Sequence, residues 1–235
     1  MKKIIIKLKF WYNIKSRISN YKMRLFLSSK KLGNHPEELN RLVGSKKHAG
    51  IILNAGDFDS KAERSLRFKK NSEYLKAFGY TSREIDLRKY FGKVDELRAF
   101  LKQFNLIWVK GGNVFFLQRA FEQSGFNIII KELLKNDALV YAGESAGSVI
   151  TGPSLEGLDI VDNTKEVPNG YLKQFSLKGL NLVNYMIAPH YKSDHPESSS
   201  VEKLVKYFKN KNISYKALRD GETIIIEGFN ERKIC

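Results

Sequence analysis

From Met23 onward, short runs of apolar residues alternate along the chain with longer amphipathic segments. Apolar runs bounded by Gly, Asn and Asp are typical of buried parallel strands that are joined by crossover helices. The pattern predicts strands over residues 24–28, 49–54, 82–86, 106–110, 138–142, 185–188, 215–218 and 223–227. It predicts helices over residues 36–42, 60–78, 94–104, 114–123, 127–136, 146–151 and 198–209, with Ser60 and Asn113 as N-caps. The fold class is therefore α/β, with a doubly wound, mostly parallel sheet flanked by helices.

Residues 153–181 lack a clean period and are rich in Gly, Asp, Asn and Lys, so we expect a long excursion there. Long loops of this kind often line functional sites. The chain ends soon after the strand predicted at 223–227, and we expect the closing hairpin of such a sheet to be missing or replaced. Residues 23–235 are enough for a single domain with one sizeable core.

Charge is distributed unevenly along the chain. There are 41 Lys and Arg residues against 25 Asp and Glu residues, which gives a formal net charge of +16. Residues 1–22 hold seven of the basic residues and no acidic one. The other basic residues are scattered over predicted helix faces without stacking aromatics, so we expect no nucleic-acid partner.

The basic segment 1–22 has two interpretations. It can be an appendage that is not native, because Met23 leads directly into the first predicted strand. Alternatively it forms a basic amphipathic helix, which would permit peripheral contact with a membrane surface but no stable insertion. The apolar face of that helix would consist of Ile4, Leu8, Trp11 and Ile18.

Cys235 is the only cysteine, so no intrachain disulfide and no thiolate metal cluster can form, which fits a reducing, cytoplasmic location. The four histidines show no pair at helical metal-binding spacing beside a carboxylate. We therefore expect no metal and no cofactor. The sequence leaves the oligomeric state open between monomer and dimer.

The motif Gly143-Glu144-Ser145-Ala146-Gly147 follows an apolar strand and precedes an apolar helix. In that context a Gly-x-Ser-x-Gly turn exposes the serine hydroxyl at the carboxyl end of the strand, where open α/β sheets bind ligands. Ser145 is thus a candidate nucleophile, and the backbone N–H of Ala146 is a natural donor to a developing oxyanion. The alternative is a strand-turn-helix whose small residues serve packing alone.

A serine hydroxyl is weakly nucleophilic until a base takes its proton, so the motif predicts a histidine at another strand end. His190 follows the strand predicted at 185–188 and is our candidate base, while His195, in a polar loop, is the weaker one. The third member should be a carboxylate that orients the imidazole. Asp220 follows another predicted strand and is our choice, with Glu222 in reserve. An Asp-Gly pair at that position is also an ordinary hairpin signal.

A second oxyanion donor must come from another loop at the same edge of the sheet. Gly111-Gly112-Asn113 follows the strand predicted at 106–110, and glycine allows close approach of the backbone to a bound carbonyl. A phosphate or dinucleotide loop is disfavoured, because the segment has neither the spaced glycines of a Rossmann fingerprint nor the lysine-serine pair of a P-loop.

Four segments together resemble the peptidase E (aspartyl dipeptidase) family in content, order and spacing: Gly111-Gly112-Asn113-Val114-Phe115, Gly143-Glu144-Ser145-Ala146-Gly147, Pro189-His190 and Leu218-Arg219-Asp220-Gly221. The match runs from about Met23 to Gly228. The resemblance implies a class I glutamine amidotransferase-like fold and a cytoplasmic serine peptidase that acts on short peptides through a Ser-His-Glu triad. By position, it makes Ser145 the nucleophile, His190 the general base, and the backbone amides of Gly112 and Ala146 the oxyanion hole.

Three positions depart from the family pattern. Asp220 stands where the characterised aspartyl dipeptidases have glutamate, Lys110 where a glycine is expected, and Glu144 where they carry an aromatic residue. A Glu144 that faces the cleft would disfavour an N-terminal aspartate and would suit a free amine. We take Gly111, Asn113 and Glu144 as candidate substrate contacts.

The function expected is that of a serine dipeptidase or exopeptidase that works through an acyl-enzyme. One alternative is an α/β-hydrolase-type esterase, in which the acid precedes the histidine and would be Asp159 or Asp162. Another is a catalytically inactive relative that binds an amine-containing or peptide ligand. A glutamine amidotransferase is disfavoured, because the turn carries serine where that chemistry uses a cysteine thiolate.

Overall fold

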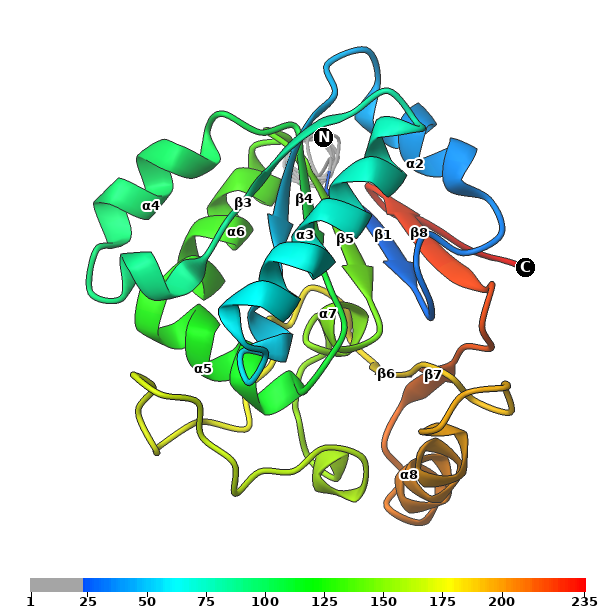
Figure 1. Ribbon diagram of the computed structural model, residues 1–235. Coiled ribbons are helices and arrows are strands. Elements are labelled where there is room, and N and C mark those ends of the chain that lie inside the picture. The colour runs from blue at the N-terminus through cyan, green and yellow to red at the C-terminus, as the bar shows by residue number, and fades with distance from the viewer. Residues whose placement is uncertain (1–22) are drawn as a thin grey trace, which may run out of the picture.

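The computed structural model describes residues 23–235, so both interpretations of residues 1–22 fall outside the described part of the chain. Its centre is a seven-stranded sheet in the order β3-β2-β4-β5-β1-β8-β9 (Figure 1). The strands of this sheet are β1 (Arg24–Ser28), β2 (His48–Ile52), β3 (Thr81–Glu84), β4 (Leu106–Val109), β5 (Val140–Glu144), β8 (Thr223–Glu227) and β9 (Asn230–Ile234). The first five in chain order run parallel, and β8 and β9 are antiparallel to their neighbours. The predicted mostly parallel α/β sheet is confirmed.

Helices cover both faces of the sheet (Figure 1). They are α2 (Pro36–Val43), α3 (Lys61–Lys76), α4 (Val94–Leu101), α5 (Val114–Ser124), α6 (Phe126–Lys135), α7 (Ala146–Val149) and α8 (Ser198–Asn210), with 3₁₀ turns η1 (Asn54–Gly56), η2 (Leu87–Tyr90) and η3 (Leu158–Ile160). Alternate residues of β1 serve opposite faces, since Leu25 and Leu27 belong to one buried cluster and Phe26 to the other. The doubly wound arrangement is therefore confirmed.

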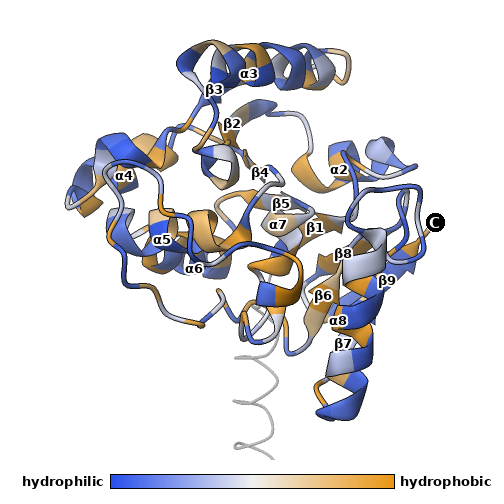
Figure 2. Ribbon diagram, turned by 60° about the horizontal axis from the view of Figure 1, so that its bottom comes forward, coloured by the Kyte–Doolittle hydropathy of each residue, from blue (hydrophilic) through white to orange (hydrophobic). Residues whose placement is uncertain are grey.

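The helix starts follow from local chemistry. Ser60 caps α3 in a capping box with Glu63, and the Asn113 side chain accepts hydrogen bonds from two backbone N–H groups of α5. Helix α3 is mostly hydrophilic (Figure 2), and only Arg64 and Leu75 of it are buried. This helix contributes ion pairs as well as apolar packing.

Two predicted strands are present in a separate sheet, and one expectation, about the C-terminal hairpin, was wrong. The strands predicted at 185–188 and 215–218 form β6 (Met186–Ala188) and β7 (Tyr215–Ala217), which pair with each other in a separate two-stranded sheet. The closing hairpin is also present, since β9 pairs antiparallel with β8 through Thr223↔Ile234. The polar residues of β9 gave no apolar run, because this edge strand is largely exposed.

The excursion predicted at 153–181 is present. Its two ends meet at an isolated bridge between Ser154 and Lys178, and it contains only the short turn η3. It runs beside the carboxyl ends of the parallel strands, where it is in contact with α8 through η3. No helix within residues 23–235 has the length and apolar character needed to cross a bilayer.

Candidate active site

Ser145 occupies the sharp turn between β5 and α7. Its backbone angles are φ 49° and ψ −115°, which few non-glycine residues adopt. The two flanking glycines are required by space. A Cβ at Gly143 would lie 2.4 Å from the carbonyl oxygen of Gly147, and a Cβ at Gly147 would lie 2.2 Å from that of Val109. The Gly-x-Ser-x-Gly pattern is therefore dictated by this turn, which presents the Ser145 hydroxyl at the strand end.

The separate pair β6 and β7 brings the other two candidates to the same place. The strands are parallel with Ala188 opposite Ala217, so the residues that follow them emerge at one edge. Nε2 of His190 lies 3.0 Å from Oγ of Ser145, and Nδ1 of His190 lies 2.6 Å from Oδ1 of Asp220. Thus Ser145, His190 and Asp220 form one continuous hydrogen-bonded chain.

Serine side chains that the sequence did not single out hold this chain in place. Buried Ser29 donates to Oδ1 of Asp220 at 2.9 Å and accepts from the backbone N–H of His190 at 2.8 Å. Ser193 accepts from the backbone N–H of Asp220 at 2.8 Å. Sequence reasoning could have found Ser29 from its position directly after β1, at the same sheet edge as Ser145.

Two effects act on the pKa of Asp220. Burial works to raise it, but the hydrogen bonds from His190 and Ser29 outweigh burial, and the pKa lies below its ordinary value. Nζ of Lys30 lies 3.3 Å from Oδ2 and acts in the same direction. Asp220 therefore carries its negative charge at neutral pH.

The two candidate oxyanion donors are free to bind a ligand. Neither the N–H of Gly112 nor that of Ala146 has a hydrogen-bond acceptor within residues 23–235. Gly112 has φ 135°, and a Cβ there would lie 2.4 Å from the carbonyl oxygen of Ala55, so glycine is required. A Cβ at Gly111 would lie 2.9 Å from that of Ser145, so this loop lies directly against the candidate nucleophile.

Two other candidate substrate contacts have partners within the chain. Glu144 forms an ion pair with Lys110, whose Nζ lies 4.0 Å from the centre of the Trp108 ring. Burial lowers the pKa of Lys110, and the charge of Glu144 partly opposes that effect. Asn113 caps α5 and donates from its side chain to the carbonyl of Asn163 at 2.8 Å. A substrate contact by either residue stays a prediction.

A pocket lies beside Ser145 and Ala146, between the excursion and α8. Its lining is mostly apolar and includes Gly112, Val149, Leu158, Val161, Pro189, Val201 and Leu204. Two carboxylates, Asp162 and Glu197, also line it. Burial raises the pKa of Asp162 to about 7, against the effect of the Val114 N–H that donates to it at 2.8 Å.

The acids considered as alternatives have other partners. Asp162 binds the N–H of Val114, and Asp159 is exposed on η3. Glu222, the reserve acid, accepts from the backbone N–H of Arg219 and from Lys233. Only Asp220 among the described carboxylates has a hydrogen bond to the His190 ring. The acid-before-histidine order of an α/β-hydrolase is therefore absent from this site.

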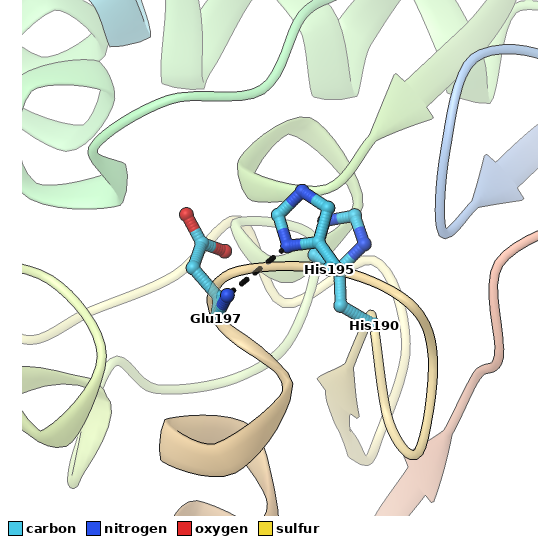
Figure 3. Close-up of side chains that lie close together, drawn as sticks. All are labelled: His190, His195 and Glu197. Atoms are coloured by element: carbon cyan, nitrogen blue, oxygen red, sulfur yellow. Dashed lines mark hydrogen bonds between the residues drawn. The ribbon is translucent and has the colours of Figure 1, made fainter.

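The ring of His195, the weaker candidate base, stacks on the ring of His190, the preferred candidate base. Their rings are parallel within 7°, with centroids 3.6 Å apart (Figure 3). Nδ1 of His195 accepts from the backbone N–H of Glu197 at 3.3 Å, and burial lowers the pKa of His195. His195 therefore packs against the face of the base.

Ligand atoms of His190, His195 and Glu197 lie within 4.8 Å of one another, a grouping that spacing along the sequence did not reveal. Both ring nitrogens of His190 are already bonded, to Ser145 and Asp220. Coordination of a metal by this histidine would break its bond to Ser145 or its bond to Asp220. The absence of a metal cofactor stays a prediction.

Comparisons with known proteins identify the family to which the chain belongs. The model of peptidase family S51 matches residues 60–234. An uncharacterized peptidase of Listeria monocytogenes is 32% identical over 154 residues, which are 66% of this chain and 71% of that protein. A probable alpha-aspartyl dipeptidase of Drosophila melanogaster is 29% identical over 133 residues, 54% of this chain and 52% of that protein.

Among solved structures, a candidate peptidase E protein from Listeria monocytogenes superposes with a TM-score of 0.73 and 25% identity. The superposition covers 91% of this chain and 98% of that one. The structural superposition and the family match thus point to the same family. The chain belongs to peptidase family S51 and is a serine peptidase with a class I glutamine amidotransferase-like α/β fold.

Proposed function

We propose that this chain hydrolyses short peptides as a dipeptidase or exopeptidase, with Ser145 as nucleophile, His190 as general base and Asp220 as the acid that orients His190. The observation that supports the proposal is the hydrogen-bonded chain from Ser145 through His190 to Asp220, at 3.0 Å and 2.6 Å. Inactive relatives need not keep such an arrangement, since a triad serves proton transfer rather than packing.

In the first half of the reaction, Oγ of Ser145 attacks the peptide carbonyl carbon while Nε2 of His190 takes the hydroxyl proton. Asp220 holds Nδ1–H and stabilises the imidazolium. The carbonyl oxygen becomes an oxyanion that accepts from the N–H groups of Gly112 and Ala146. His190 then gives its proton to the leaving amine, and the C–N bond breaks.

In the second half, a water molecule attacks the ester between the substrate acyl group and Ser145. His190 takes a proton from that water, and a second oxyanion forms in the same hole. When it collapses, the bond to Oγ breaks and the serine regains a proton from His190. The free acid leaves, and atoms and charges balance over the cycle.

The pocket points to the class of peptide. Asp162 and Glu197 place two carboxyl groups beside Ser145, and the rest of the lining is largely apolar. A free N-terminal ammonium suits these carboxylates, whereas an aspartyl side chain would be repelled by them. We therefore expect unblocked short peptides with an uncharged first residue as substrates, in contrast to the activity that the name of the Drosophila relative states.

A library of unblocked dipeptides and tripeptides, incubated with pure protein, tests the proposal. Turnover should require Ser145, and N-acetylated versions of the best substrates should react at least tenfold more slowly. A fluorophosphonate probe should label wild-type protein and leave S145A unlabelled. Absence of both turnover and labelling would instead indicate the inactive, ligand-binding relative.

A further inference from the structure

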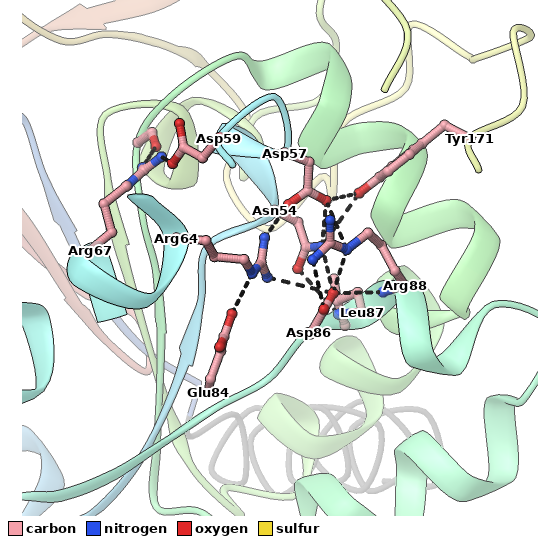
Figure 4. A network of polar contacts seen from close by, with 11 residues as sticks. Asn54, Asp57, Asp59, Arg64, Arg67, Glu84, Asp86, Leu87, Arg88 and Tyr171 are labelled. Atoms are coloured by element: carbon pink, nitrogen blue, oxygen red, sulfur yellow. Dashed lines mark hydrogen bonds and ion pairs between the residues drawn. The ribbon is translucent and has the colours of Figure 1, made fainter. Parts of the chain in front are cut away.

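A guanidinium group contacts the loop Gly111-Gly112-Asn113, which carries the candidate oxyanion donor Gly112. Arg67, on α3, donates from Nη2 to the backbone carbonyl of Gly111 at 2.9 Å. Its Nη1 donates to Oδ2 of Asp59 at 2.7 Å (Figure 4). The sequence did not single out either residue, because a charged residue on a polar helix and another just before that helix resemble any solvated surface.

The contact fixes the orientation of one peptide group. The bond between Gly111 and Gly112 is trans, because no cis peptide occurs in residues 23–235. In a trans peptide the C=O and the following N–H point in opposite directions. With the Gly111 carbonyl held by Arg67, the N–H of Gly112 is directed to the opposite side, where Gly112 lines the pocket with Ser145.

This restraint is needed because two adjacent glycines have little intrinsic preference for one peptide orientation. The other side of the loop is held by Ala55, whose carbonyl accepts from the N–H of Asn113 at 2.8 Å. That contact fixes the next peptide group but leaves the Gly111-Gly112 peptide free to rotate. Arg67 supplies the missing restraint.

Arg67 is itself held in place. A Cβ at Gly56 would lie 1.7 Å from its Nη1, so only a glycine in η1 lets the guanidinium pack there. Asp59 lies three residues further along and binds the same nitrogen. The side chain of Arg67 is 32% exposed and that of Asp59 is 27% exposed, so the pair is partly shielded from solvent.

The positive charge of Arg67 has a second effect, in addition to orienting the Gly111-Gly112 peptide. A cation bound to a carbonyl oxygen draws electron density through the amide and makes the N–H on the other side a stronger donor. This effect acts while the oxyanion exists, since that is when the N–H of Gly112 meets full negative charge. It does little for a neutral carbonyl in the bound substrate.

We propose that Arg67, held by Asp59, is a positioning residue that orients and polarises the Gly111-Gly112 peptide so that the N–H of Gly112 serves the oxyanion. The inference rests on the proposed function, because it assigns a role within the same reaction. It predicts that loss of Arg67 weakens binding of the transition state and leaves ground-state binding unchanged.

The experiment compares R67M, R67K and D59N with wild type. R98M is the matched control, because Arg98 lies in a surface ion pair with Glu132 and its side chain is also 32% exposed. For the best peptide, R67M should lower kcat about 10- to 100-fold with KM within twofold of wild type, somewhat less than the loss of a whole oxyanion donor. A peptide aldehyde, whose adduct with Ser145 places an oxyanion in the hole, should lose affinity by the same factor.

The conservative variant separates a role in orientation from a role in folding. R67K keeps one donor and the charge, so it should recover part of the lost kcat, and D59N should lower kcat about threefold to tenfold. R98M should match wild type. Circular dichroism and thermal unfolding verify that each variant is folded, and D59N carries the test if R67M does not fold.

The inference is overturned if R67M has the kcat of R98M, or if its KM rises while kcat holds. The rate of fluorophosphonate labelling gives a second readout that needs no peptide turnover, since the phosphonyl oxygen occupies the same hole. A wild type that is labelled but cleaves no peptide overturns the proposed substrate, and slower labelling of R67M would then still support the role of Arg67. A wild type that is neither labelled nor able to cleave peptides overturns both proposals.

Discussion

Lys110, directly after β4, forms an ion pair with Glu144, the last residue of β5. The pairing follows from the register, because Val109 lies opposite Gly143 and the next residues are neighbours. The side chains are 8% and 14% exposed. These are two of the positions at which the chain departs from the peptidase E pattern, and the departures compensate each other. A lysine without the glutamate would leave an unpaired charge beside Ser145.

We predict that K110M and E144Q each lower the free energy of unfolding by about 3–5 kcal/mol, because each leaves its partner charge buried and unpaired. The double variant K110M/E144Q should recover most of that loss. Urea denaturation of the four proteins measures the coupling. Simple addition of the two single effects would contradict a direct pair.

Because Asp220 is proposed to orient His190, its replacement should reduce activity strongly and change the structure little. D220N should lower kcat/KM about 10³- to 10⁴-fold, because the amide no longer stabilises the His190 imidazolium. E222Q is the control, since Glu222 contacts Lys233 and the backbone of Arg219 and should leave the rate within twofold. A large loss in E222Q, with D220N close to wild type, would instead identify Glu222 as the acid.

Much of this site could be predicted from the sequence because its main residues each follow an apolar run. Ser145, His190 and Asp220 were chosen as residues at strand ends, and the structure brings them together. The separate sheet of β6 and β7 could not be predicted, because a three-residue apolar run carries no information about which strand it pairs with. The edge strand β9 was missed for lack of any apolar run.

The supporting residues could not be predicted for a different reason. Ser29 and Asp220 are 191 residues apart in the chain, and Arg67 and Gly111 are 44 apart. A lone serine or a lysine-rich helix has no local pattern that points to such a partner. These contacts depend on the packing of whole elements, which one sequence does not reveal.

The backbone conformation of Ser145 predicts that glycine at this position is less strained than other residues, although activity requires the serine hydroxyl. Its angles of φ 49° and ψ −115° are strained for serine and free of strain for glycine. S145G should therefore be more stable than S145A by about 1–2 kcal/mol, although both lack the hydroxyl and should be inactive. At the exposed Ser65 in α3 the order should be reversed, with S65G less stable than S65A by about 1 kcal/mol. Chemical denaturation measures both pairs, and the same order at both positions would argue against strain at Ser145.

The carboxyl of Asp162 predicts that the stability of the fold decreases as pH rises. Burial raises the pKa of this carboxyl from 3.8 to about 7 in the folded chain. Between about pH 4 and pH 7 the folded state holds a proton that the unfolded state has lost, so the free energy of unfolding falls as pH rises through this window. The loss is complete above pH 7 and amounts to about 4 kcal/mol, at about 1.4 kcal/mol per pKa unit.

D162N removes this dependence, because an amide does not titrate and its oxygen can still accept from the N–H of Val114. Its free energy of unfolding should equal that of wild type near pH 4 and exceed it at pH 8. D159N, at an exposed position three residues earlier, should follow wild type at every pH. Urea titrations from pH 4 to pH 8 provide the measurement, and a constant difference between D162N and wild type would mean that Asp162 titrates as an ordinary carboxyl. If Asp162 also binds the substrate amine, KM of wild type should rise below pH 7, where the carboxyl becomes neutral, while D162N should show a high KM throughout.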